Sequence, residues 1–475
     1  MKRAYILLSA LAFLIVASCS SPNTDKPKYV FYFIGDGMGI QHVNAAQLYL
    51  DSVEHYNNQT RISFLDFPVG SFATTYAANR YITGSAAAGT ALSTGSKTSI
   101  GTIGLNADHS DSLFSIAKKF KQNGFKVGVV TSVSIDHATP AAFYAHQPER
   151  DNYYEISLDL ARSGYHFFAG GPVKDPTGKR SNNPGISFYE LAEKNGVAIT
   201  DRLDLVDSLS KTSKTILYNA PNTASGNSLQ YEIDRKEGDV SLADLTSAAI
   251  TALHNPDGFF LMVEGGKIDW AAHDNDGATT IKEVIAFSQA VAKAVEFYNK
   301  HPNETLIVVT ADHETGGLSI GNYLNGYNSN LAILREQNVS QGELAATLKN
   351  LKAEKPKASL NEVKDSLARY IGLFTVISPD DIESKELERA YSVSFGGATS
   401  SKHYDSFNYN GINDVAATGV AIVNRKAGLG WSSYSHTGSP VPVYVMGSGD
   451  ALFKGSMTNT DIPLRILKAT GIESR

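Results

Sequence analysis

The stretch YVFYFIGDGMG, residues 29–39, places six apolar or aromatic residues directly before a carboxylate, Asp36, that lies between two glycines. Both alternations of residues 29–34 are apolar, which predicts a strand buried on both faces, as in parallel sheets. Further runs of this kind follow at residues 127–131, 259–263, 305–310 and 441–446.

Helical patterns separate these runs, at residues 111–123, 242–254 and 279–300, the second of them after a plausible cap at Ser241. Strands that alternate with helices indicate an α/β domain with a mainly parallel sheet. We expect a three-layer sandwich, in which this sheet is flanked by helices and the catalytic domain covers residues 28–475.

Two regions break the alternation. Residues 172–235 are polar and rich in turn formers, and residues 320–430 carry charged helical stretches followed by a Gly/Ser/Asn/Tyr-rich passage. We interpret both as insertions on the core, crown-like and placed around the active-site face.

The amino terminus resembles an export signal. Lys2 and Arg3 precede an apolar stretch too short to span a bilayer comfortably, and VASC ends in Cys19, the only cysteine, as in a bacterial lipobox. We expect a signal peptide at 1–18, a lipidated Cys19, a polar tether at 19–27, and a lipid-anchored protein of the periplasm or cell surface. The alternative is an ordinary signal peptide with an incidental cysteine.

The charge of the chain argues against a nucleic-acid partner. Its 475 residues carry a formal net charge of −6, and no long basic run is present.

Carboxylates and histidines gather where the predicted strands end, which is where open α/β sheets bind ligands. Such convergent sets suit divalent cations, and two cations a few ångströms apart are typical of phosphoryl transfer. Alone, each residue also has a structural reading: a turn, a helix cap, a salt bridge or a core histidine. The candidates are Asp36, His137, Glu264, Asp269, His273, Asp312, His313 and His436.

Ser85 lies in YITGSAAAGTALSTGSKT, residues 81–98, a segment with very little side-chain bulk. At a helix N-terminus its hydroxyl could attack an approaching phosphate, favoured by backbone N–H groups and the helix dipole. The alternative is a helix cap with small residues for close packing. Arg150 is a candidate for bidentate contact with phosphate, although a solvated surface arginine is the commoner case.

The motifs GDGMG, TGSAAAGTALSTGSKT, HATPAA with YAH…R, FFLMVEGGKID…H, TADHETGG and SHTG occur in one order from residue 29 to about 447. Together they resemble the bacterial alkaline phosphatases of the metal-dependent alkaline phosphatase superfamily. The resemblance implies hydrolysis of small phosphate monoesters through a phosphoserine on Ser85, with Arg150 holding the phosphate, and a possible homodimer.

The same resemblance implies two Zn²⁺ and one Mg²⁺. One zinc would be held by Asp269, His273 and His436, and the other by Asp36, Asp312 and His313. The third cation would be held by Asp36, Thr139 and Glu264, with His137 and Trp270 beside that site.

Three positions depart from the best-known bacterial pattern. Gly84 replaces an aspartate that helps to orient the arginine, His137 replaces an aspartate, and Trp270 replaces a lysine. The identity of the third metal and the partner of Arg150 are therefore open at this point.

Two alternative functions share parts of this pattern. A superfamily phosphodiesterase, or a related phosphate or sulfate ester hydrolase, would normally carry a different nucleophile motif and lack the arginine. A lipoprotein that binds phosphate compounds or metal without turnover would be favoured if an essential ligand were missing, and none is.

Overall fold

The computed structural model describes residues 26–53, 61–396 and 414–473. The predicted signal peptide, Cys19 and nearly all of the tether lie outside these residues. Within them, no helix is both long enough and apolar enough to cross a membrane.

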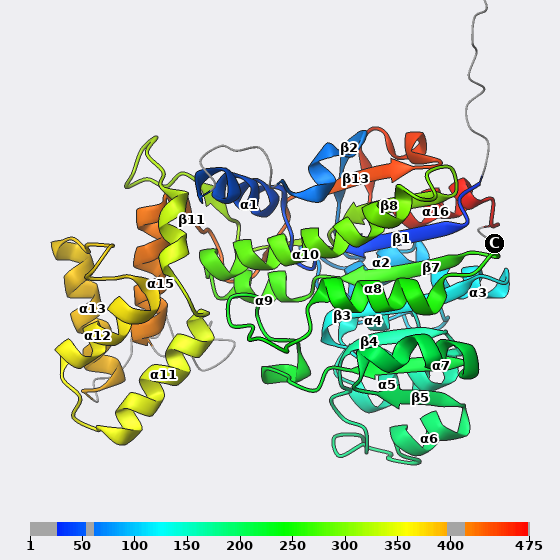
Figure 1. The fold of residues 1–475 in the computed structure, drawn as a ribbon, viewed down its shortest axis with the longest axis horizontal. Helices are drawn as coiled ribbons and strands as arrows, with labels where there is room; N and C mark the ends of the chain where they lie inside the picture. The colour runs from blue at the N-terminus through cyan, green and yellow to red at the C-terminus, as the bar shows by residue number, and fades with distance from the viewer. Residues whose placement is uncertain (1–25, 54–60, 397–413, 474–475) are drawn as a thin grey trace, which may run out of the picture.

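A ten-stranded sheet forms the centre of the molecule, with the strand order β14-β2-β13-β8-β1-β7-β3-β4-β6-β5 (Figure 1). Neighbouring strands from β8 to β5 are parallel, whereas β13 is antiparallel to both β8 and β2. The strands are β1 (Tyr29–Ile34), β2 (Val69–Thr74), β3 (Lys126–Ser134), β4 (Phe167–Gly171), β5 (Val197–Thr200), β6 (Thr215–Asn219), β7 (Phe259–Glu264), β8 (Thr305–Thr310), β13 (Val441–Gly447) and β14 (Met457–Thr458). This mixed, mostly parallel sheet confirms the predicted fold class.

Helices cover both faces of the sheet. In Figure 1, α8 (Leu242–Leu253) and α10 (Gly277–Tyr298) lie in front of it, whereas α2 (Ser85–Thr94) and α4 (Ala138–Ala141) lie behind it. The remaining helices of this part are α1 (Ile40–Val53), α3 (Ile116–Gln122), α5 (Tyr153–Ser163), α6 (Phe188–Lys194), α7 (Val206–Thr212), α9 (Lys267–His273) and α16 (Asp461–Thr470), with short 3-10 turns η1 (Ser63–Asp66), η2 (Leu203–Leu205), η3 (Ser225–Asn227) and η5 (Asp450–Phe453).

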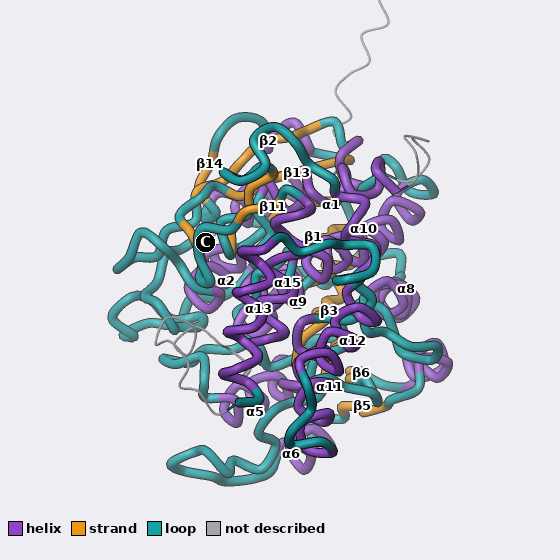
Figure 2. Tube along the Cα trace, turned by 90° about the vertical axis from the view of Figure 1, so that its left-hand side faces the viewer, coloured by secondary structure: helices purple, strands orange, loops and turns teal. Residues whose placement is uncertain are grey.

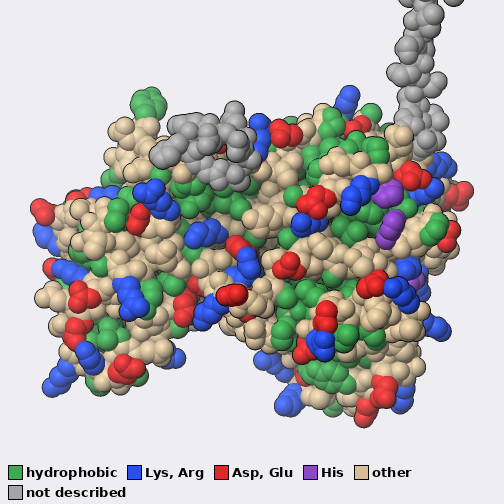
Figure 3. Space-filling view, viewed as in Figure 1, with side chains coloured by type: hydrophobic (Ala, Val, Ile, Leu, Met, Phe, Trp, Pro, Cys, Tyr) green, Lys and Arg blue, Asp and Glu red, His purple; other side chains and the backbone are tan. Residues whose placement is uncertain are grey.

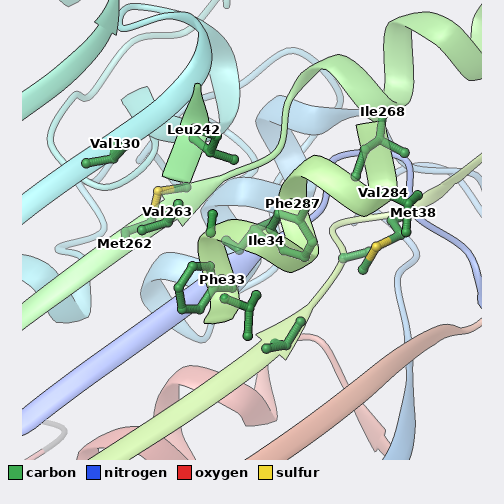
Figure 4. Close-up of a cluster of buried hydrophobic side chains, with 14 of the residues drawn as sticks. Phe33, Ile34, Met38, Val130, Leu242, Met262, Val263, Ile268, Val284 and Phe287 are labelled. Atoms are coloured by element: carbon green, nitrogen blue, oxygen red, sulfur yellow. The ribbon is translucent and has the colours of Figure 1, made fainter. Parts of the chain in front are cut away.

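The core lies between the central strands and α10. Phe33 of β1 and Phe287 of α10 are fully buried and meet edge to face, with ring centroids 5.9 Å apart (Figure 4). All six residues of β1 are buried, as its double-sided apolar pattern predicts.

Two predicted helices are confirmed almost to the residue, and one is shorter than predicted. Ser241 caps α8 through a capping box, and Asp276 caps α10 by accepting from the backbone N–H of Thr279. Residues 111–115 are not helical, because α3 begins only after its own cap, Ser115, and the chain before it is held by a bridge between Leu105 and Ser112.

Residues 172–235 contribute to the central sheet, and their status as an insertion stays a prediction. They supply β5 and β6, which extend the parallel sheet beyond β4, together with α6 and α7. β5 is a four-residue strand at the sheet edge, and β6, which pairs with both β4 and β5, is only five residues long. Strands this short give a weak apolar pattern, which explains why the sequence analysis did not predict them.

Residues 331–427 include a helical lobe beside the sheet, on the left in Figure 1 and facing the viewer in Figure 2. It contains η4 (Leu331–Glu336), α11 (Gln341–Glu354), α12 (Leu360–Ile371), α13 (Asp381–Ser394) and α15 (Asp414–Ala427). The two-stranded pairing of β10 (Ser319–Ile320) with β11 (Leu429–Gly430) closes the lobe at its base. Lysine, arginine, aspartate and glutamate side chains lie on the surface of the lobe, at the left of Figure 3, in agreement with the charged helical stretches in the sequence. Its status as an insertion stays a prediction.

Candidate active site

The central strands bring the acidic candidates to one edge of the sheet. Asp36 follows β1, Glu264 ends β7 and Asp312 follows β8, and these three strands are parallel neighbours in register. All three carboxylates are fully buried. Buried carboxylates this close together require protons, hydrogen bonds or cations to balance them.

Asp36, Asp312 and His313 form the first cluster. His313 Nε2 lies 3.3 Å from Asp36 Oδ1 and 3.3 Å from Asp312 Oδ2. The backbone N–H of Gly37 donates to Asp312 Oδ1 at 3.2 Å and fixes that carboxylate. Gly37 has φ +73°, a left-handed conformation that glycine adopts at little cost.

Asp269, His273 and His436 form the second cluster. Helix α9 places the first two on one face, with His273 Nε2 3.4 Å from Asp269 Oδ1. His436 Nε2 lies 3.1 Å from His273 Nε2 and 3.5 Å from Asp269 Oδ1. The antiparallel pairing of β12 (His436–Thr437) with β9 (Glu314–Thr315) brings His436 beside His313, and their rings stack at 3.6 Å.

A third group consists of Asp36, Glu264 and His137, with Thr139 beside it. These three residues bring possible ligand atoms within 4.8 Å of one another. Thr139 Oγ1 donates to Asp36 Oδ2 at 3.4 Å and also lies 3.5 Å from Asp312 Oδ2. The structure therefore brings all eight predicted ligands together, and it moves His137 from the surroundings into the group.

The electrostatics of these clusters fit divalent cations. Burial, followed by Asp312, raises the pKa of Asp36 well above its usual range, and burial raises the pKa of Glu264 to about 8 and that of Asp312 to about 7. One oxygen each of Asp36 and Glu264, and Nδ1 of His137, are buried without a hydrogen-bond partner in the described residues. Hard oxygen and borderline imidazole donors are what Mg²⁺ and Zn²⁺ prefer.

Asp269 behaves differently from these carboxylates. Burial raises its pKa, but His273, His436 and His313 together outweigh burial and hold it well below the usual range. This carboxylate therefore stays ionised beside three imidazoles, as a ligand must.

Ser85 begins α2, as predicted, after Gly84 as the N-cap residue. Its Oγ lies 3.3 Å from His313 Nε2, so the hydroxyl touches the first cluster. The packing interpretation of the segment also holds, because a Cβ added to Gly89 would come within 3.2 Å of Ala142 and Thr139. The small residues thus let α2 lie directly against α4, which carries Thr139.

Arg150 is held by a residue that the sequence did not identify as its partner. Arg150 Nη2 donates to His137 Nε2 at 2.9 Å. Trp270 packs edge-on against the same imidazole, with ring centroids 5.9 Å apart.

Several residues that hold the candidate ligands in place were not predicted from the sequence. Thr315 Oγ1 donates to Asp269 Oδ1 at 2.6 Å and lies 3.3 Å from His313 Nδ1, and Thr131 donates a hydrogen bond to Glu264. Two backbone carbonyls, of Tyr434 and Thr83, lie 2.6 Å from His273 Nδ1 and 2.8 Å from His436 Nδ1. Of these partners, only Thr315 could have been found from the sequence, because it lies in the motif TADHETGG. Backbone carbonyls leave no signal in the sequence.

A serine at a helix start beside two carboxylate–imidazole clusters is typical of metal-dependent phosphoryl transfer. The model of the family described as alkaline phosphatase matches residues 27–166 and 178–472. Alkaline phosphatase 4 of Bacillus subtilis (strain 168) is 33% identical over 469 residues, covering 95% of this chain and 91% of its own.

Solved structures agree. The cold-active alkaline phosphatase of Shewanella sp. has a TM-score of 0.75 at 28% identity and covers 93% of this chain and 99% of its own. A histidine-to-aspartate mutant of alkaline phosphatase TAB5, from an Antarctic bacterium, was solved with Mg bound in its M3 site; its TM-score is 0.64 at 25% identity, with 94% and 99% covered. The chain belongs to the alkaline phosphatase family, and it is a phosphoric monoester hydrolase.

Proposed function

We propose that this protein is an exported alkaline phosphatase that hydrolyses phosphate monoesters through a phosphoserine at Ser85, on a site with two Zn²⁺ and one Mg²⁺. The observation that carries this proposal is the 3.3 Å contact between Ser85 Oγ and His313 Nε2, where the two clusters adjoin.

The donor sets support the metal assignment. Asp269, His273 and His436 would hold one zinc, and Asp36, Asp312 and His313 the other. Asp36, Glu264 and Thr139 would hold the third cation, with His137 as a further candidate ligand. When bound, these cations neutralise charge on the attacking and leaving oxygens. Magnesium in the third position is in keeping with the Mg site of the TAB5 mutant.

The protein's own residues account for the rest of the reaction. Ser85 Oγ attacks phosphorus, the bond from phosphorus to the ester oxygen breaks, and the alcohol leaves with a proton. Water then attacks the phosphoserine, which releases inorganic phosphate and restores the hydroxyl. The start of α2 directs backbone N–H groups and the positive end of its dipole toward the phosphate, and Arg150 binds its oxygens.

A comparison of monoester and diester hydrolysis distinguishes this proposal from a phosphodiesterase, which is the main alternative. The protein, reconstituted with Zn²⁺ and Mg²⁺, is assayed with p-nitrophenyl phosphate and bis-p-nitrophenyl phosphate at alkaline pH. The proposal predicts that the monoester is strongly preferred, because Arg150 pairs with oxygens that a diester has blocked. Preference for the diester would favour a phosphodiesterase, and absence of both activities would favour a binding lipoprotein.

Export and anchoring are proposed from the leader sequence alone. Labelling of the full chain with a palmitate analogue in a bacterial host tests the lipid on Cys19, with Cys19→Ala as the control. Equal labelling of both proteins would contradict the anchor. Sedimentation of the purified protein would test the homodimer that the resemblance implies.

A further inference from the structure

A large cavity opens between the sheet domain and the helical lobe, on the side of the second cluster. Its volume is about 890 Å³, and residues from the end of α9, the loop after β10, α15 and the segment 429–434 line it. Among these is His273 itself, whose Nδ1 is held by the carbonyl of Tyr434, another lining residue. The cavity therefore begins at a residue of the active site.

The reaction geometry indicates what this cavity faces. In a displacement at phosphorus the leaving oxygen lies opposite the attacking one, and a two-cation site stabilises one oxygen at each cation. Ser85 touches His313 of the first cluster, so the leaving oxygen belongs at the second cluster. The alcohol attached to that oxygen then extends past His273, toward the cavity.

The lining is suited to a ring-bearing alcohol. Trp431, Tyr434, Tyr323 and Tyr327 contribute aromatic surface, and Ala417 and Ala421 form a flat wall one turn apart on α15. Tyr323 and Tyr327 are almost completely exposed on the loop between β10 and η4. Aromatic side chains left exposed beside a cavity commonly serve recognition, and sites of this size bury ligands far larger than glycerol.

Charge in the cavity favours a neutral group over a second anion. Arg425 is the only lysine or arginine among the described residues that line it, and its guanidinium is paired with Glu386 at 2.6 Å and with Glu383 at 3.6 Å. Gln341 is buried at the cavity wall, where its side-chain amide offers both a donor and an acceptor. That amide can bind a polar edge of a ring.

We infer that this cavity binds the alcohol half of the substrate and selects phosphate monoesters of large, ring-bearing alcohols such as nucleosides. The inference rests on the proposed function. It goes further in assigning a substrate class to residues that lie outside the metal clusters.

The test compares adenosine 5′-monophosphate with glycerol 3-phosphate, which are both monoesters of primary alcohols. On the metal-reconstituted full chain, kcat/KM for the nucleotide should exceed that for glycerol phosphate by about tenfold or more. Ala421→Trp fills the cavity and should remove most of this preference, because the KM for the nucleotide rises more than the KM for glycerol phosphate. Thr418→Trp, on the same helix but outside the lining, is the matched control.

Two further measurements test the inference independently of Ala421→Trp. Tyr327→Ala, at an exposed position, should reduce the preference severalfold, whereas Tyr189→Ala, on α6, should not. Calorimetry with adenosine alone should show binding to the wild type and none to Ala421→Trp. A nucleotide preference that Ala421→Trp leaves intact, or no adenosine binding by the wild type, would overturn the inference; loss of turnover with both esters would instead contradict the proposed function.

Discussion

Arg150 Nη2 donates a hydrogen bond to His137 Nε2 at 2.9 Å, and this contact supplies the orientation that Gly84 cannot. Burial, followed by Arg150 and Lys174, lowers the pKa of His137 well below its usual value, so the imidazole is neutral and able to accept. His137 thus links Arg150 to the group of Asp36 and Glu264.

We predict that His137→Ala weakens phosphate binding by about tenfold, because a hydrogen bond to a charged group contributes roughly 1.5–3 kcal/mol. The measurement is the inhibition constant of inorganic phosphate at saturating Mg²⁺, with metal content determined in parallel. His137→Asn, which keeps an acceptor, should lose less. Equal phosphate inhibition of His137→Ala and wild type would show that Arg150 is oriented by something else.

Gly84→Asp tests the same contact by restoring phosphate affinity rather than removing it. A Cβ at this position meets only Ile100, at 4.0 Å, and φ is −122°, so a side chain fits without strain. In the His137→Ala background, we expect Gly84→Asp to recover part of the phosphate affinity through a new acceptor for Arg150. Gly84→Ser is the control, because it also caps α2 but carries no charge; equal recovery by both would point to the helix cap.

Thr315 is predicted to tune zinc affinity without binding metal. Its hydroxyl donates a hydrogen bond to Asp269 and lies beside His313. Removal of a residue that orients a metal ligand in this way typically lowers metal affinity by about 10–100-fold. Thr315→Val should therefore weaken zinc binding in a chelator competition, whereas Thr315→Ser should not. Unchanged zinc affinity in Thr315→Val would show that the hydroxyl has no such role.

In the metal-free protein, the contribution of Glu264 and Asp312 to stability should fall as the pH rises from about 7 to 8. Glu264 and Asp312 have raised folded-state pKa values, of about 8 and about 7, so the folded state binds more protons than the unfolded state in this window. Stability then falls with pH. His313 and His436, whose pKa values burial lowers, oppose this trend mainly below pH 7. Burial also lowers the pKa values of Lys97 and Lys267 to about 8, and these lysines oppose the trend at the upper end of the window.

Urea midpoints in EDTA at pH 7, 7.5 and 8 measure this slope in the wild type and in Glu264→Gln, because the lysines and histidines contribute to both proteins. Adding Zn²⁺ and Mg²⁺ should reverse it, because metal binding requires ionised ligands and strengthens with pH. Without metal, the midpoint should fall more steeply in the wild type than in Glu264→Gln; equal slopes in the two proteins would contradict the raised pKa of Glu264.

The sequence alone predicts the buried parallel strands and those site residues that lie in motifs at the strand ends. Double-sided apolar runs such as 29–34 predict buried parallel strands, and because such strands end at one edge, the residues after them predict a shared site. The partnership of Arg150 with His137 could not be predicted, since it depends on loop conformation. The carbonyls that hold His273 and His436 leave no trace in side-chain identity, and β5 and β6 are too short, at four and five residues, to give a clear apolar pattern.

The central claim is that Ser85 carries the phosphoryl group. The direct measurement is peptide mapping by mass spectrometry after the metal-reconstituted protein is incubated with a phosphate monoester and quenched in acid. We predict one added phosphoryl group on the peptide that contains Ser85, and none in Ser85→Ala, which should still bind zinc. A phosphoryl group on another residue, or normal turnover by Ser85→Ala, would contradict the account.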